Sequence, residues 1–153
     1  MRESCFRGKK LDNGEWVYGF LLICDERYFI IPETKIGCVT TEWLKKGEYG
    51  FYGFVEVDPA TVGRYTGLTA NGKKIFEGDV FRYGLLAVAA VAVVKFGEYS
   101  FGSQFDMNCV GFYLEWTPRA MLYRKDLGFW VKQREIEIIG NIHDNPELLE
   151  EVQ

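Results

Sequence analysis

Apolar and polar residues alternate in the first part of the chain with the two-residue period of β-strands. Trp16, Tyr18 and Phe20 take every second position, so we expect their side chains to share one face of a strand. Asn13 with Gly14 is typical of a tight hairpin turn, because both residues tolerate a positive φ. The pattern predicts a three-stranded meander over residues 5–11, 15–24 and 27–32.

The middle of the chain combines a short strand with a sequence that favours one helical turn. Residues 54–57 are predicted to form the strand, and Asp58 can cap the amides of a following helix. Pro59 suits the first helical position, where no backbone N–H is needed. We expect Gly63 to end the turn in a left-handed conformation.

Further turn signals divide the rest of the chain. Asn71 with Gly72 predicts a hairpin, and the Glu-Gly-Asp sequence at 77–79 predicts a turn that starts a strand over 80–83. Residues 85–96 are apolar and β-branched between two glycines, which favours a strand buried on both faces, although the alanines leave a buried helix open. The remaining predicted elements are strands over 110–116, 128–132 and 135–142 and a short closing helix that begins at Asn145 and Pro146.

At least six short strands with regular turn signals predict a mainly β protein, built as a small barrel or sandwich. Residues 33–53 are less regular, and no element is predicted there. Residues 63–71 separate the N-terminal strands from the rest, so we expect a boundary between two lobes in this segment.

Composition is consistent with a folded, β-rich protein. The 153 residues are 48% hydrophobic and 16% aromatic, with a net charge of −4, which argues against disorder and against a dedicated nucleic-acid binder. The longest apolar run spans residues 85–94, half of the ~20 residues that a membrane-spanning helix needs. The first residues lack the apolar segment of a signal peptide, so we expect a soluble, cytoplasmic protein without a membrane partner.

The ligand types for a metal site are few. His143 is the single histidine, and the four cysteines include no CxxC pair, so a structural zinc site is disfavoured. Buried free thiols are the expected state of the cysteines. We predict no metal and no cofactor.

Catalytic motifs are also missing from the sequence. GxSxG, Walker and HExxH patterns do not occur. Glu77 and Asp79 form a possible carboxylate pair, and His143 is the one candidate base, but a turn followed by a strand start explains both carboxylates. We therefore expect a protein that is not an enzyme, and we keep an enzyme with these three residues as the third hypothesis.

The most basic segment lies at residues 119–134, where aromatic residues that could stack on bases accompany the cations. The same pattern describes an ordinary exposed strand or a protein interface, and these alternatives stay open. The aromatic residues are Tyr123, Phe129 and Trp130. The candidate nucleic-acid contacts are Arg119, Arg124, Lys125, Lys132 and Arg134.

Aromatic residues also crowd the glycine-rich region before residue 54. Side chains of this kind typically anchor interfaces when they do not all fit inside, although they can equally cover the core. The candidate interface residues are Tyr49, Phe51 and Tyr52.

Three stretches of sequence resemble the YopX family of bacteriophage and prophage proteins. The first stretch is Phe-Arg-Gly-Lys at 6–9 with Asp-Asn-Gly-Glu-Trp-Val-Tyr-Gly at 12–19. The second is Val-Asp-Pro-Ala-Thr-Val-Gly-Arg-Tyr-Thr-Gly-Leu at 57–68, followed by Asn-Gly-Lys at 71–73 and Ile-Phe-Glu-Gly-Asp-Val at 75–80. The third is Ile-Gly-Asn-Ile at 139–142 with Asn-Pro-Glu-Leu-Leu at 145–149.

The resemblance implies a mainly β protein with an SH3-like barrel, encoded by a phage or prophage, that self-associates into oligomers. It supplies no catalytic residues. Ala60 and Arg64 stand where the family commonly has Glu and Gln, so any ligand role of those positions in relatives does not carry over. We expect an N-terminal β-meander lobe with an aromatic loop over 1–62, and an SH3-like barrel lobe with a short C-terminal helix over 63–153.

The leading hypothesis is a phage or prophage protein in the cytoplasm of a bacterial host. It would act as a non-enzymatic, self-associating interaction module that binds a host or phage macromolecule. The alternative is a small β-barrel protein that binds single-stranded nucleic acid through residues 119–134.

Overall fold

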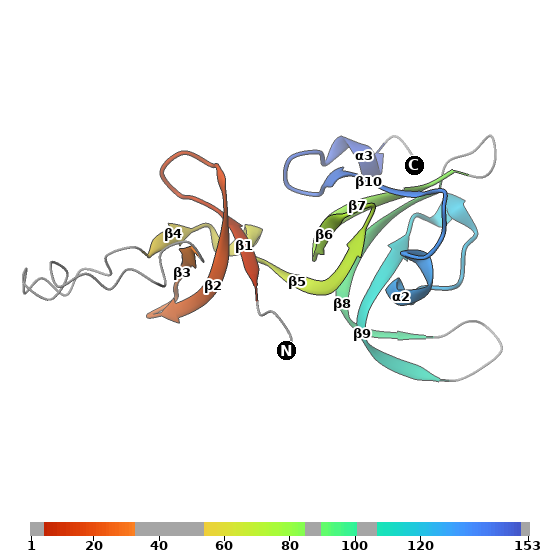
Figure 1. Ribbon diagram of the computed structural model, residues 1–153, viewed down its shortest axis with the longest axis horizontal. Coiled ribbons are helices and arrows are strands. Elements are labelled where there is room, and N and C mark those ends of the chain that lie inside the picture. Colours follow the sequence, from red (N-terminus) through yellow and green to blue (C-terminus); the bar gives the residue numbers. More distant parts are fainter. Residues whose placement is uncertain (1–4, 33–53, 85–89, 101–106, 151–153) are drawn as a thin grey trace, which may run out of the picture. The chain divides into compact units, whose positions relative to one another are not determined.

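The protein is mainly β, with two antiparallel sheets and a few short helices. The computed structural model describes residues 5–32, 54–84, 90–100 and 107–150. Two compact units are present, unit 1 (Met1–Tyr65) and unit 2 (Thr66–Gln153). No closed barrel is found among the described strands. Figure 1 labels the elements of both units.

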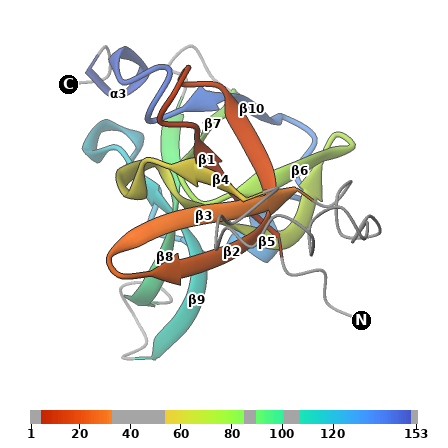
Figure 2. The ribbon, with the colours of Figure 1, turned by 90° about the vertical axis from the view of Figure 1, so that its left-hand side faces the viewer.

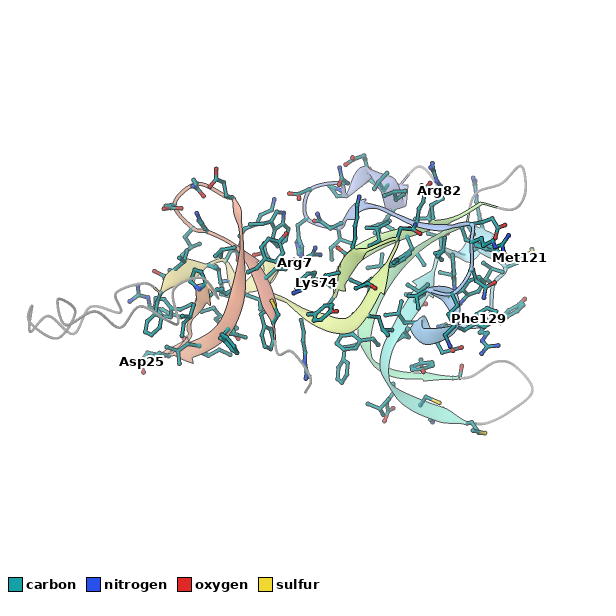
Figure 3. The ribbon with its side chains drawn as sticks, in the orientation of Figure 1. Arg7, Asp25, Lys74, Arg82, Met121 and Phe129 are labelled. Atoms are coloured by element: carbon teal, nitrogen blue, oxygen red, sulfur yellow. The ribbon has the colours of Figure 1, made fainter. Side chains whose placement is uncertain are left out.

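Unit 1 contains the predicted three-stranded meander, and the sequence-based assignment of these strands is confirmed. Figure 2 shows β2 and β3 side by side, as their antiparallel pairing requires. Gly14 has φ +71° in the first connection. Asp25 and Glu26 both have positive φ in the second connection, and Asp25 lies at the tip of this hairpin (Figure 3). The strands of the unit are β1 (Phe6–Lys9), β2 (Trp16–Cys24), β3 (Arg27–Pro32) and β4 (Val55–Val57).

The core of unit 1 is small and lies on one face of this sheet. Ile30 and Val57 are fully buried there, together with Val17. Gly8 lies against Val57, and a methyl group on Gly8 would come within 3.0 Å of the Val57 side chain. A bridge between Lys10 and Val57 links the chain after β1 to β4. The core of unit 1 therefore leaves no room for a larger side chain at Gly8 of β1.

The predicted helical turn follows β4 as the 3₁₀-helix η2 (Pro59–Thr61). Asp58 caps it as predicted, because its Oδ1 accepts a hydrogen bond of 3.0 Å from the Ala60 amide. The prediction for Gly63 was wrong. The turn ends at Val62 in an extended conformation, and Gly63 begins β5 (Gly63–Ala70), where it pairs with Arg7. Pairing to β1 keeps the chain extended where an isolated helix end would turn left-handed.

Strand β5 begins in unit 1 and continues into unit 2, where it forms a hairpin with β6. Asn71 and Gly72 have φ of +51° and +76° at the predicted turn. Gly78 has φ +87° at the next predicted turn, before β7. The other strands of unit 2 are β6 (Lys73–Phe76), β7 (Asp79–Tyr83), β8 (Ala90–Ser100), β9 (Asn108–Trp116) and β10 (Ile136–Asn141).

Strand β8 is the centre of unit 2. Its first five residues, 90–94, are buried and alternate between two cores, as the sequence predicts. Residues 95 and 96 of the predicted buried strand are exposed, and residues 85–89 lie outside the described residues. Ala92 and Val94 belong to the larger core, with Phe81 and Leu114, while the alternate residues of β8 belong to a second cluster beneath α3 (Glu147–Glu150). Ala70 and Ile75 place the β5–β6 hairpin in the larger core as well. The four-stranded sheet has the order β10-β7-β8-β9.

One predicted strand of unit 2 is a helix. Residues 128–132 were expected to be extended, but Leu127–Trp130 form the short helix α2. It follows the 3₁₀-helix η3 (Pro118–Ala120). The indole of Trp130 packs on that of Trp116, with ring centroids 4.8 Å apart. Docking of this side chain on the end of β9 fixes the helical turn, and no strand partner exists for the segment among the described residues.

Candidate functional site

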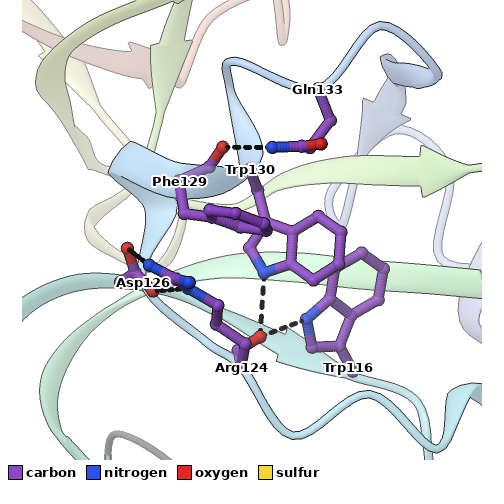
Figure 4. Close-up of polar contacts among 6 residues, drawn as sticks. All are labelled: Trp116, Arg124, Asp126, Phe129, Trp130 and Gln133. Atoms are coloured by element: carbon purple, nitrogen blue, oxygen red, sulfur yellow. Dashed lines mark hydrogen bonds and ion pairs between the residues drawn. The ribbon is translucent and has the colours of Figure 1, made fainter.

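The basic segment 119–134 is organised around one backbone carbonyl. Trp116 Nε1 and Trp130 Nε1 both donate hydrogen bonds to the carbonyl oxygen of Arg124, over 3.0 and 2.8 Å (Figure 4). Both indoles are buried. The main chain at Arg124 is thus attached to the core of unit 2.

Two of the five candidate cations are paired with carboxylates. The Arg124 guanidinium lies 2.7 Å from Asp126 Oδ1 and stacks over the Phe129 ring, 3.8 Å from its centroid (Figure 4). Lys125 Nζ lies 3.2 Å from Glu115 Oε1. Both carboxylates reduce the positive potential at the centre of the segment.

The other three cations are exposed to solvent. Arg119, Lys132 and Arg134 have no ion pair with any residue that the structure describes. Of the aromatic residues in the segment, Tyr123 is 69% exposed and Trp130 is 5% exposed. Tyr123 is therefore the ring available for stacking, and Trp130 belongs to the core.

The candidate interface aromatics Tyr49, Phe51 and Tyr52 lie outside the described residues. The structure instead shows exposed apolar side chains on a part of unit 2 that sequence reasoning did not single out. We call the outer parts of β8 and β9, residues 95–100 and 108–113, the β8–β9 arm. It continues beyond the other strands of the sheet (Figure 1).

The face of the arm that carries these side chains is the continuation of a core face. Val94 pairs with Leu114, and both are fully buried. The next pair on the same face is Phe96 with Phe112, whose rings meet edge to face at 5.0 Å. Phe96 is 51% exposed, and Val110, one pair further out, is 69% exposed. The alternation of apolar residues from 110 to 116 is the sequence signal that could have located this face.

The possible catalytic residues Glu77, Asp79 and His143 are brought to one region by backbone contacts. The Ile142 amide donates to the Gly78 carbonyl over 2.9 Å, which joins the turn before β7 to the segment after β10. Asp79 is buried, and its Oδ2 accepts a 2.8 Å hydrogen bond from the Phe76 amide. This bond holds the turn closed, which is a structural role of the kind the sequence favoured.

The side chain of Asn141 organises the segment that contains His143. Its Oδ1 accepts hydrogen bonds from the amides of His143 and Asp144, and its Nδ2 donates to Asp144 Oδ2 over 2.8 Å. The turn is therefore fixed by backbone and amide contacts. Among the described residues no group of three or more His, Cys, Asp or Glu side chains could hold a metal ion. Cys24 and Cys109 are free thiols, and both are half-buried rather than buried as expected.

No helix among the described residues is long and apolar enough to cross a membrane. The fold and these contacts define a mainly β protein of two units, with sequence-distant turns joined in unit 2. A family model for the YopX protein matches residues 5–150, and the chain belongs to the YopX family. None of the curated proteins matches the chain.

Proposed function

We propose that this YopX-family chain is a non-enzymatic interaction module of phage or prophage origin. It associates with itself and binds a host or phage macromolecule in the cytoplasm of a bacterial cell. The apolar face of the β8–β9 arm carries the proposal, because Phe96 and Val110 extend a core face into solvent. Isolated exposed apolar residues are ordinary on monomers, whereas a continuous apolar strip typically marks an interaction site.

Light scattering on the purified protein over a range of concentrations tests self-association. We expect a mass above that of one 17.7 kDa chain, rising toward a fixed oligomer as the concentration increases. A tagged pull-down from bacterial cells, half of it treated with nuclease, tests the second part. A protein partner that survives nuclease supports the proposal. A strictly monomeric protein that retains no protein partner contradicts it.

We also propose that residues 63–153 form the SH3-like barrel lobe and that residues 1–62 form the meander lobe. The support is the larger core of unit 2, to which the β5–β6 hairpin contributes Ala70 and Ile75 and the four-stranded sheet contributes Phe81 and Leu114. A hairpin and a small antiparallel sheet thus share one core, as the strands of a small barrel do. An experimental structure that separates the hairpin from this core would contradict the proposal.

Binding of single-stranded nucleic acid is the second candidate function. The observation in its favour is the exposure of Arg119, Lys132 and Arg134 together with Tyr123. Filter binding of a labelled oligonucleotide at low salt measures it directly. If the function is present, neutralising Lys132 and Arg134 lowers affinity for all sequences alike and flattens the salt dependence. No retention at low salt excludes this candidate.

A further inference from the structure

The outer edge of strand β9 is covered over only part of its length. The Leu114 amide donates to the Lys125 carbonyl over 2.7 Å, and Tyr113 bridges to Asp126, so the segment before α2 covers this half of the edge. The preceding residues, Asn108–Phe112, pair with β8 on their other side. No described residue outside β8 exchanges a backbone hydrogen bond with them. We call Asn108–Phe112 the free edge.

The free edge lacks the features by which proteins protect edge strands. Such features are charged side chains, prolines, bulges or a covering segment. The sequence from 108 to 113, Asn-Cys-Val-Gly-Phe-Tyr, contains no charge and no proline. The register between β8 and β9 runs through nine consecutive pairs without a shift, so there is no bulge. The backbone N–H and C=O groups of the free edge that point away from β8 are therefore regularly spaced, as pairing with a further strand requires.

Strand β10, the opposite edge of the same sheet, is protected. Its register with β7 shifts between Ile138 and Gly140, which is a bulge. Glu137 is exposed on it and forms an ion pair with Arg82. The protected edge, β10, and the free edge of β9 belong to the same sheet, so the two edges can be compared directly. One edge prevents further pairing and the other permits it.

We propose that the free edge of β9 is where a second copy of this chain adds, strand to strand and antiparallel. The inference rests on the proposed self-association and assigns its site. When the five residues of the free edge pair with themselves over their full length, Val110 lies opposite Val110 of the other copy. Phe112 then lies opposite Asn108. Because the strand carries no charge, this pairing brings no like charges together.

The apolar face of the arm favours the same arrangement. Side chains that lie opposite in an antiparallel pair point to the same side of the sheet. Pairing at Val110 therefore joins the strip of Phe96, Phe112 and Val110 to its counterpart across the new sheet, with Asn108 and Glu98, the β8 partner of Val110, as polar residues on the same face. The arrangement is two-fold symmetric and closes with two copies, since the described four-stranded sheet of each copy offers one such edge.

Two opposite charges at residue 110 test this pairing in the full chain. Val110→Lys and Val110→Glu each place like charges opposite each other across the two-fold axis. For each variant alone, we expect the dissociation constant of the dimer, measured by sedimentation velocity, to be on the order of tenfold higher or more than that of the unchanged protein. An equal mixture of the two variants places Lys opposite Glu, and we expect it to form the dimer again.

Ile23→Lys is the matched control, because Ile23 is an exposed apolar strand residue of unit 1, 54% exposed. It should leave association unchanged, and circular dichroism should show all variants folded, since Val110 is a surface residue. Association that both Val110 variants retain in full overturns the assigned site and leaves self-association standing. So does loss of association that mixing does not restore. A protein that is monomeric without substitution removes the proposed self-association and this inference with it.

Discussion

At the scale of single residues, the sequence predicts best where a backbone conformation demands a particular residue type. Asn71 and Gly72 adopt the positive φ that their turn requires, and Asp58 caps η2. Gly63 is the instructive failure, because a glycine after a helical turn has the right local chemistry for a left-handed end. Pairing with β1, which local sequence does not encode, makes it extended.

Gly8 shows how tightly a residue can be restricted by its neighbours. A Cβ at this position would lie 3.0 Å from Cβ and Cγ2 of Val57 and 3.3 Å from Cδ1 of Ile30. Both neighbours are fully buried and cannot move aside. We expect Gly8→Ala to lower the free energy of unfolding by about 1–3 kcal/mol in chemical denaturation.

Gly84→Ala is the control for that substitution, since a Cβ at Gly84 meets nothing within 4 Å. The control should leave the free energy of unfolding within about 0.5 kcal/mol of the unchanged protein. If Gly8→Ala is as stable as the control, the space beside β1 is larger than the structure indicates.

The ion pair between Arg27 and Glu56 gives unit 1 a pH dependence of known sign. The hydrogen bond from the Arg27 guanidinium lowers the pKa of Glu56 below its ordinary value of 4.5. A carboxyl group with a lowered pKa in the folded state stabilises the fold above its unfolded pKa. That contribution is lost as the pH falls below about 4.5 and through the lowered value.

Melting temperatures of the unchanged protein and of Glu56→Gln, measured at pH 7 and at pH 3, test this sign. We expect a small deficit of the variant at pH 7, because the pair is exposed, and a smaller or vanishing deficit at pH 3. A deficit that is equal at both pH values would mean that the charge of Glu56 contributes nothing to folding.

At the scale of elements, the long apolar run was assigned correctly, and one short run was not. The assignment of residues 85–96 as a strand buried on both faces rested on many consecutive β-branched and apolar residues, and the structure confirms it for residues 90–94. The assignment of 128–132 as a strand rested on three large apolar residues, a run too short to reveal its period. Packing of Trp130 against Trp116 decided the conformation, and that contact joins residues of separate elements.

The attachment of α2 to β9 predicts a specific cost. Trp130→Phe removes the indole N–H that donates to the Arg124 carbonyl and part of a buried ring. We expect a loss of about 1–3 kcal/mol in the unfolding of unit 2, because Trp116 still satisfies the carbonyl. Denaturation measures the loss, with Tyr123→Phe as an exposed aromatic control. Equal stability of the two variants would show that this hydrogen bond does not hold α2.

At the scale of the whole molecule, the two units have separate cores, so we expect two unfolding transitions. Gly8→Ala should lower the transition of unit 1 alone. Leu114→Ala, which opens a cavity at a fully buried position, should lower that of unit 2 by about 2–5 kcal/mol. Differential scanning calorimetry distinguishes this behaviour from one shared transition that moves equally in both variants.

What the sequence could not predict at this scale is the surface. Family membership and the mainly β class follow from motifs and periodicity, and both are confirmed. Exposure of Val110 and Phe96 depends on how far β8 and β9 continue past the core, which is a property of the folded sheet. The pairing of Arg124 and Lys125 with carboxylates is likewise tertiary, so a basic segment in the sequence overstates the positive potential of the folded surface.

The two tryptophans that donate hydrogen bonds to the Arg124 carbonyl are also fluorescent probes of unit 2. Trp116 and Trp130 are shielded from water in the folded state and become hydrated when unit 2 opens. Their fluorescence should therefore shift to longer wavelength at that step. Replacing Trp16 and Trp43, the two tryptophans of unit 1, by phenylalanine would remove the competing signals. The protein thus contains a built-in optical reporter for the unit that carries the free edge.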